Sequence, residues 1–298
     1  MGNNCCGGRE DEKVKQRAAA DSYASGIRSK YASGMRNTYR SGNARGGDDC
    51  ERFDKAFENN DLKEFIRLLG STQKIDSLEE PMHPWAEDPK TVGALAATQL
   101  AILASTDGTE AGQSETRKYK DEIRKLGGID PLVQYLKSPD VDRNEAAVVA
   151  LSFLSVDSDT NCQLMYDAGA IELLVPHLKS QKEGMRAATA STLRNLYVIS
   201  QEARKEFASS KGLVDFLKLL DFAPPKKGAE PNWDTQFEAL FNLEDLMTMD
   251  DEVVPEIASL IKGAGVIPKL EKLSGDACPD EEVKELAQAI MGRLEGAS

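Results

Sequence analysis

Three residues at the start of the chain carry an amine or a thiol that acyltransferases could modify. Removal of Met1 leaves Gly2 with a free amine in a small, uncharged context that is typical of N-myristoylation, and Cys5 and Cys6 follow at once. One myristoyl chain binds a bilayer only weakly, with an association constant on the order of 10⁴ M⁻¹. Palmitoylation of both thiols would supply the second anchor, so residues 1–12 are predicted to be a lipidated tip. The alternative is a chance Met-Gly start with unmodified cysteines.

The segment that follows is basic. Between Lys13 and Arg45 there are eight lysines and arginines against one aspartate, a formal charge of +7, whereas the remainder of the chain carries −20. Cations near an anionic leaflet contribute about 1 kcal/mol each to membrane attraction. Tyr-x-Ser-Gly recurs every eight residues without an apolar stripe, so residues 13–48 are predicted to be a disordered, flexible linker. Phosphorylation of its Ser and Tyr residues would weaken membrane contact, and a plain linker is the alternative.

Residues 49–298 show helical repeats and almost no strand signal. Apolar helices, each preceded by a glycine, are predicted to begin near Ile129, Ile171 and Leu213, at a spacing of 42 residues. A fourth helix of this type begins near Val266, out of this spacing. The preceding glycines, which are expected to allow a left-handed turn, are Gly127, Gly128, Gly169, Gly212 and Gly265. Each unit would bury its apolar face only by stacking on its neighbours, so an all-α solenoid is predicted.

A second type of helix alternates with the first. Its motif is Leu193-Arg194-Asn195-Leu196 in one copy and Leu240-Phe241-Asn242-Leu243 in the next. A period of 42 lies in the range of about 40–47 residues found for armadillo and HEAT repeats, and the Leu-x-Asn-Leu helix resembles armadillo repeats. Polar insertions at 105–115 and 222–233 interrupt the period. Trp85, next to Pro84, and Trp233 both stand in irregular stretches and are predicted to pack there, with recognition of a partner as the alternative.

Catalytic and metal-binding patterns are missing from the sequence. No phosphate-binding loop, zinc-protease or serine-hydrolase motif occurs, and His83 and His177 are the two histidines. Cys50, Cys162 and Cys278 are too scattered for a disulfide framework or a metal site. We therefore expect no enzyme, no cofactor, no metal and no nucleic-acid partner, and the lack of an apolar signal segment predicts a protein that meets membranes from the cytosol.

Armadillo solenoids bind partners along a groove lined by the last helix of each repeat. Nuclear import receptors of this fold place tryptophans one turn before the groove asparagines, and none stands at those positions here. That disfavours recognition of nuclear localisation signals. The groove positions change from apolar in the earlier repeats to polar in the later ones, which favours an amphipathic partner segment. Packing of Val149 and Phe153 between repeats is the alternative interpretation. The predicted groove residues are Val149, Phe153, Ser191, Asn195, Glu238 and Asn242.

Taken together, the Met1–Cys6 hexapeptide, the basic linker and the armadillo-like body resemble the armadillo-repeats-only proteins of apicomplexan parasites. The resemblance implies a peripheral protein, anchored through lipidated Gly2, Cys5 and Cys6 on the cytosolic face of rhoptries. It also implies that the protein positions these organelles at the cell apex by recruiting a myosin motor, a dedicated interacting protein and an adenylate cyclase. The alternatives are an armadillo adaptor of the yeast vacuole-inheritance type on another membrane and a soluble armadillo transport receptor.

Overall fold

The computed structural model describes residues 48–75, 89–105, 110–222, 233–276 and 278–297. Gly2, Cys5 and Cys6, the predicted tip and nearly all of the predicted linker lie outside these ranges, as does Trp85. The first elements are α2 (Asp48–Asn59), α3 (Leu62–Leu68), α4 (Val92–Leu103), α5 (Glu110–Lys125), α6 (Ile129–Tyr135) and α7 (Val141–Ser155). They are followed by α8 (Asp159–Asp167), α9 (Ala170–Leu174), the 3-10 helix η1 (Val175–Lys179), α10 (Glu183–Tyr197), α11 (Gln201–Ser209), α12 (Lys211–Leu217) and the 3-10 helix η2 (Lys218–Leu220). The last elements are α13 (Asp234–Met247), β1 (Thr248–Met249), β2 (Glu252–Val253), α14 (Pro255–Gly263), α15 (Ile267–Ser274) and α16 (Glu281–Gly296).

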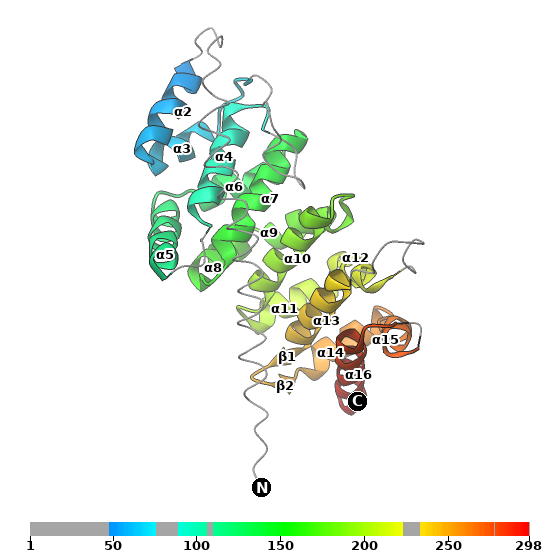
Figure 1. Cartoon of the computed structure of the whole chain (residues 1–298). Helices are drawn as coiled ribbons and strands as arrows, with labels where there is room; N and C mark the ends of the chain where they lie inside the picture. The colour runs from blue at the N-terminus through cyan, green and yellow to red at the C-terminus, as the bar shows by residue number, and fades with distance from the viewer. Residues whose placement is uncertain (1–47, 76–88, 106–109, 223–232, 277, 298) are drawn as a thin grey trace. The chain divides into compact units, whose positions relative to one another are not determined.

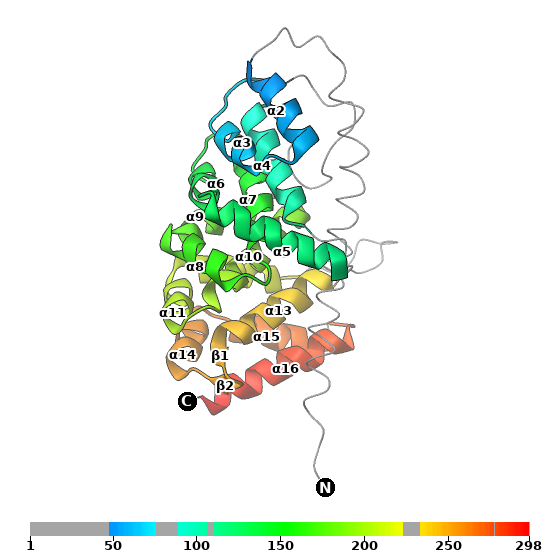
Figure 2. The ribbon, with the colours of Figure 1, turned by 90° about the vertical axis from the view of Figure 1, so that its left-hand side faces the viewer.

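These helices follow the armadillo order of a first, a second and a third helix in each repeat. In the part of the chain that the structure describes, the third helices are α4, α7, α10, α13 and α16 (Figure 1). The chain divides after Leu154 into two compact units, and each is described by itself. Within the second unit α13 packs against both α10 and α16, and Figure 2 shows the three in that order. The prediction of an all-α armadillo solenoid is confirmed.

The apolar periodicity predicted the core of both units. Leu151 and Leu154 of α7 are fully buried, and so are Leu193 and Leu196 of α10 at the matching positions. Cys50, Cys162 and Cys278 are buried free thiols. Removing such leucines from water at every repeat is the main stabilising contribution, because each one buries its side chain against the next helix.

The left-handed conformation predicted for five glycines occurs at three of them, and Gly128, with φ of −75°, and Gly212 do not adopt it. Gly127 and Gly169 have φ of +75° and Gly265 has φ of +84°, a left-handed conformation that glycine adopts without steric cost. Gly212 instead lies inside α12. A Cβ atom there would lie 2.5 Å from Cγ2 of Val175 and 2.8 Å from Oγ of Ser210, so this glycine is needed for close helix approach.

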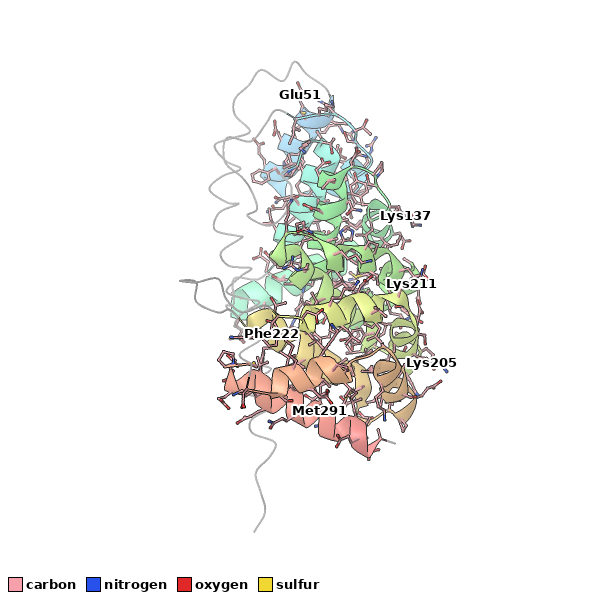
Figure 3. All side chains as sticks on the ribbon, turned by 90° about the vertical axis from the view of Figure 1, so that its right-hand side faces the viewer. Glu51, Lys137, Lys205, Lys211, Phe222 and Met291 are labelled. Carbon is pink, nitrogen blue, oxygen red and sulfur yellow. The ribbon has the colours of Figure 1, made fainter. Side chains whose placement is uncertain are left out.

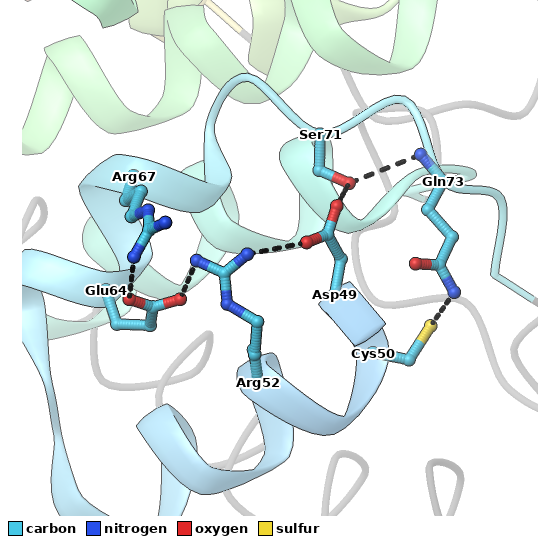
Figure 4. A network of polar contacts seen from close by, with 7 residues as sticks. All are labelled: Asp49, Cys50, Arg52, Glu64, Arg67, Ser71 and Gln73. Atoms are coloured by element: carbon cyan, nitrogen blue, oxygen red, sulfur yellow. Dashed lines mark hydrogen bonds and ion pairs between the residues drawn. The ribbon is translucent and has the colours of Figure 1, made fainter. Parts of the chain in front are cut away.

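A polar network joins the first helices of the first unit (Figure 4). Arg52 of α2 lies between two carboxylates, with Nη1 2.9 Å from Oδ1 of Asp49 and Nη2 paired with Glu64 of α3. Ser71 donates its hydroxyl to Oδ2 of Asp49 at 2.7 Å, and the backbone N–H of Gln73 donates to that hydroxyl oxygen at 3.3 Å. The network fixes the turn after α3 to the start of α2.

The predicted insertions differ from regular repeats less than their composition indicates. Helix α5 begins at Glu110, so the second half of the first insertion is helical, and Thr116 of this helix donates its hydroxyl to the carbonyl of Ser105 at 2.9 Å. Residues 106–109 and 223–232 lie outside the described ranges. Trp233 packs edge-on against Phe222 at a ring-centroid distance of 4.8 Å, in agreement with its predicted packing role. A hairpin of β1 and β2 connects α13 to α14.

Candidate functional site

The third helices of the second unit present a mostly polar face. At matching positions on neighbouring helices, Ser191 of α10, Glu238 of α13 and Glu285 of α16 are all exposed to solvent. One of these exposed side chains is a small hydroxyl and two are carboxylates. We call this surface the third-helix face of the second unit, and define it by these three residues with Arg194 and Asn195.

The two predicted groove asparagines have different environments. Asn195 is half-buried and donates its side-chain N–H to Oγ of Ser155 at 3.0 Å, and among the described residues no donor bonds to its side-chain oxygen. Asn242 is only 4% exposed, and its backbone carbonyl accepts a hydrogen bond from the hydroxyl of Tyr197 at 2.6 Å. Asn195 therefore offers hydrogen-bonding groups to a ligand, whereas Asn242 has little surface to offer.

The two predicted groove residues of the first unit also differ. Val149 of α7 is 1% exposed and packs inside the unit, while Phe153 of the same helix is half-buried. The burial of Val149 agrees with the alternative interpretation, in which these side chains pack between repeats and do not line a groove. The accessible members of the predicted groove are Phe153 in the first unit and Ser191, Asn195 and Glu238 in the second; their binding role stays a prediction.

One arginine of the third-helix face, Arg194, stacks on an aromatic ring of the next repeat. This contact was not predicted from sequence. Arg194 of α10 donates from Nε to Oδ2 of Asp245 on α13 at 2.5 Å, and its guanidinium carbon lies 5.4 Å from the ring centroid of Phe241. Both contacts cross between neighbouring repeats, as does the 3.1 Å ion pair of Glu244 with Arg293 of α16. A signal for the stack existed, because Arg194 and Phe241 occupy the same position, before Asn, of the Leu-x-Asn-Leu motif.

A buried hydroxyl and a buried guanidinium support this face from below. Full burial raises the pKa of the Tyr197 hydroxyl, and the carboxylate of Asp245 raises it further, so the group stays protonated and remains a donor. Arg204 of α11 is 7% exposed and donates to the backbone carbonyls of Asp245 and Val198, which lie near the C-terminal ends of α13 and α10. A cation placed there offsets the partial negative charge of both helix ends. These hydrogen bonds join the C-terminal parts of α10 and α13.

The described side chains do not build a metal site. Within the described ranges no three His, Cys, Asp or Glu side chains lie close enough to hold a metal ion. The described helices also include none with the length and apolarity required to cross a bilayer. The polar side chains of the third-helix face can form hydrogen bonds and ion pairs with another macromolecule.

Comparisons with known proteins agree with this architecture. The model of the armadillo/beta-catenin-like repeat matches residues 116–156 and 158–196. The solved structure of ARO, the armadillo repeats only protein from Plasmodium falciparum, is similar with a TM-score of 0.76 and 41% sequence identity. The similarity covers 84% of this chain and 99% of that one.

Two further similarities are more limited. Vacuolar protein 8 of Saccharomyces cerevisiae is 34% identical over 108 residues, which span 36% of this chain and only 18% of the yeast protein. A designed armadillo repeat protein in complex with the peptide (KR)4 has a TM-score of 0.58 at 20% identity, with coverage of 98% of this chain and 95% of the designed one. That last likeness concerns the fold alone.

Proposed function

Because the chain belongs to the armadillo-repeats-only family, we propose that this armadillo scaffold is anchored on the cytosolic face of an organelle membrane. The acyl groups would be carried by Gly2, Cys5 and Cys6, with the basic segment 13–48 as electrostatic support. The family resemblance implies the rhoptry as the organelle, and positioning at the cell apex as the role. The supporting observation is that similarity to the Plasmodium protein extends over most of this chain.

Protein partners are proposed to dock on the third-helix face of the second unit. By family resemblance they include a myosin motor, a dedicated interacting protein and an adenylate cyclase. The designed armadillo protein holds a basic peptide, but here the ring of Phe241 already carries the guanidinium of Arg194. A partner lysine or arginine would have to displace an ion-paired arginine from that ring, so an amphipathic segment with polar groups near Ser191 and Asn195 suits this face better.

The first test concerns anchoring. Gly2→Ala should move the full chain from the membrane pellet to the supernatant of fractionated cells, because cysteines without myristate seldom reach a membrane-bound palmitoyl transferase. Joint replacement of Cys5 and Cys6 by Ser should leave weak, exchanging attachment, since one acyl chain binds only marginally. Asn3→Ala, which keeps both acyl signals, is the matched control. A Gly2→Ala chain that still pelleted with membranes would refute lipid anchoring.

The second test concerns the partner face. Ser191→Arg inserts a long charged side chain into the exposed surface of α10, whereas Ser209→Arg makes the same change on an exposed position of α11. We expect the first variant to lose recovery of a myosin heavy chain from cells of the native organism, and the second to retain it. Both variants should remain membrane-bound and equally helical by circular dichroism. Equal recovery with both variants would move the site away from the third-helix face.

A second candidate membrane follows from the yeast similarity. The match to vacuolar protein 8 favours attachment to a vacuole-like compartment by an adaptor of the same general design. A fluorescent fusion of the full chain, imaged in its native cell beside rhoptry and vacuole markers, separates the two. Co-localisation with the vacuole marker would replace the rhoptry proposal.

A further inference from the structure

One helix of the second unit exposes only a line of two cations and one apolar side chain. Over residues 211–220, which form α12 and η2, Lys211, Val214 and Lys218 are the exposed residues, and the others are buried. Their spacing of three and four residues places them on one side of the helix. Val214 is 49% exposed, the second-highest value among the large apolar side chains found exposed in the described ranges.

A buried carboxylate holds two lysines at this surface. Nζ of Lys179 from η1 and Nζ of Lys218 both lie 2.7 Å from oxygens of Asp215, which is itself buried. Burial by itself would raise the pKa of Asp215, but hydrogen bonds from both lysines outweigh burial and keep the pKa below its usual range. The two lysine side chains remain 60% and 57% exposed, so their outer faces are open to solvent.

Beyond Lys218, this exposed surface continues to Phe222 and to a lysine that covers it. Figure 3 labels Lys211 and Phe222, with α12 running between them. Half-buried Phe222 is covered by Lys272 of α15, whose Nζ lies 4.4 Å from the ring centroid and 3.2 Å from the backbone carbonyl of Phe222. We call Lys179, Lys211, Val214, Lys218 and Lys272 the lysine face.

The charge of the lysine face is opposite to that of the unit around it. Residues 155–298 contain 25 acidic and 15 basic residues. Helix α13 carries four acidic residues and no basic one, whereas residues 211–220 carry two lysines and one aspartate. In the described part of the chain Lys211 makes no ion pair, so its full charge is available to an anionic surface.

We propose that the lysine face rests on an anionic bilayer, with Val214 among the lipid headgroups and the lysines beside lipid phosphates. This rests on the proposed membrane attachment, and adds to it an orientation for the second unit. Each lysine near an anionic leaflet strengthens binding about fivefold. Protein interfaces exclude lysine from their buried centres, and this face has no aromatic anchor beyond the covered Phe222. A bilayer leaves the lysines hydrated, so it fits better than an acidic protein.

The first experiment reads contact at the face itself. The full chain, myristoylated at Gly2 and carrying Ser in place of Cys5 and Cys6, receives an environment-sensitive dye through Val214→Cys, while the three remaining thiols are buried. With phosphatidylcholine vesicles containing phosphatidylserine the dye should shift to shorter wavelength, and high salt should reverse the shift. The same dye at Leu164→Cys of α8, a position 38% exposed, should stay unshifted.

The outcomes separate this proposal from membrane attachment. A chain that pellets with the vesicles while the dye at position 214 stays unshifted would overturn the lysine face and leave attachment through the tip and linker intact. A chain that shows no measurable affinity for the vesicles in an equilibrium titration at low salt, where weak exchanging attachment is detected, would overturn both. Equal shifts at positions 214 and 164 would also count against an oriented contact.

Matched variants give a second reading. Lys211→Glu with Val214→Glu should lower vesicle affinity by about tenfold or more, since one lysine is lost and repulsive charge is added. Lys118→Glu with Leu126→Glu makes the same charge change on α5 and at the residue after it, in the first unit, where both side chains are exposed. Its effect should be several times smaller. Equal losses in the two double variants would mean that net charge, and not the lysine face, governs binding.

Discussion

Tyr197 joins two third helices through one buried hydroxyl group, and its removal is a sharp test of how the second unit is held together. The side chain is 0% exposed and donates to the backbone carbonyl of Asn242 at 2.6 Å. Tyr197→Phe deletes the oxygen and keeps the ring, which packs at 5.2 Å between centroids on Phe207. The perturbation is therefore confined to one hydrogen bond between α10 and α13.

The expected cost follows from the geometry. Because Asn242 lies inside an α-helix, its carbonyl also accepts a hydrogen bond from the backbone N–H four residues later. In the variant the carbonyl therefore loses one of two hydrogen bonds and keeps the other. We expect a loss of about 1–2 kcal/mol in the free energy of unfolding. For a chain of this size that corresponds to a fall of about 2–8 °C in melting temperature.

Thermal and urea unfolding followed by circular dichroism measure the loss. Tyr166→Phe is the control, because that hydroxyl also joins two helices, donating to Glu206 at 2.8 Å, but on the solvent-exposed surface. Its effect should stay within about 0.5 kcal/mol. The reasoning would be refuted if Tyr197→Phe matched the wild type, or if both variants lost the same stability.

Two further predictions concern the first unit. Gly93→Ala should destabilise it by about 1–3 kcal/mol in urea unfolding, because the new Cβ would lie 2.6 and 2.7 Å from two backbone carbonyl oxygens; Gly263→Ala, with no atom within 4 Å, should cost nothing. The pKa of Asp54 is raised from 3.8 to about 6 by burial and by the charges of Glu58 and Glu51. The folded state thus holds an extra proton between about pH 4 and pH 6, and stability falls as pH rises through that window. Asp54→Asn should remove this slope and be the more stable form above pH 6; an unchanged slope in unfolding curves across pH 4–7 would contradict the assignment.

Local sequence was sufficient to predict the repeat architecture. Apolar residues at helical spacing must be buried, and units that cannot bury them alone must stack, so Leu151, Leu154, Leu193 and Leu196 were predictable as core. Gly127, Gly169 and Gly265 were predictable as left-handed turns, since few other residues adopt that conformation cheaply. The prediction of lipid acceptors at Gly2, Cys5 and Cys6 likewise rests on local sequence.

Tertiary structure alone decided which polar and marginal positions reach solvent. Asn195 and Asn242 share a motif, yet only Asn195 keeps accessible surface, because the depth of a residue depends on how neighbouring helices pack and not on its own repeat. Gly212 looks like the other turn glycines, but it lies inside α12, where a Cβ atom would come within 2.5 Å of Val175 from the preceding repeat. Sequence periodicity describes one helix at a time, whereas the pairing of Arg194 with Asp245 and of Lys179 with Asp215 depends on distances between helices from different repeats.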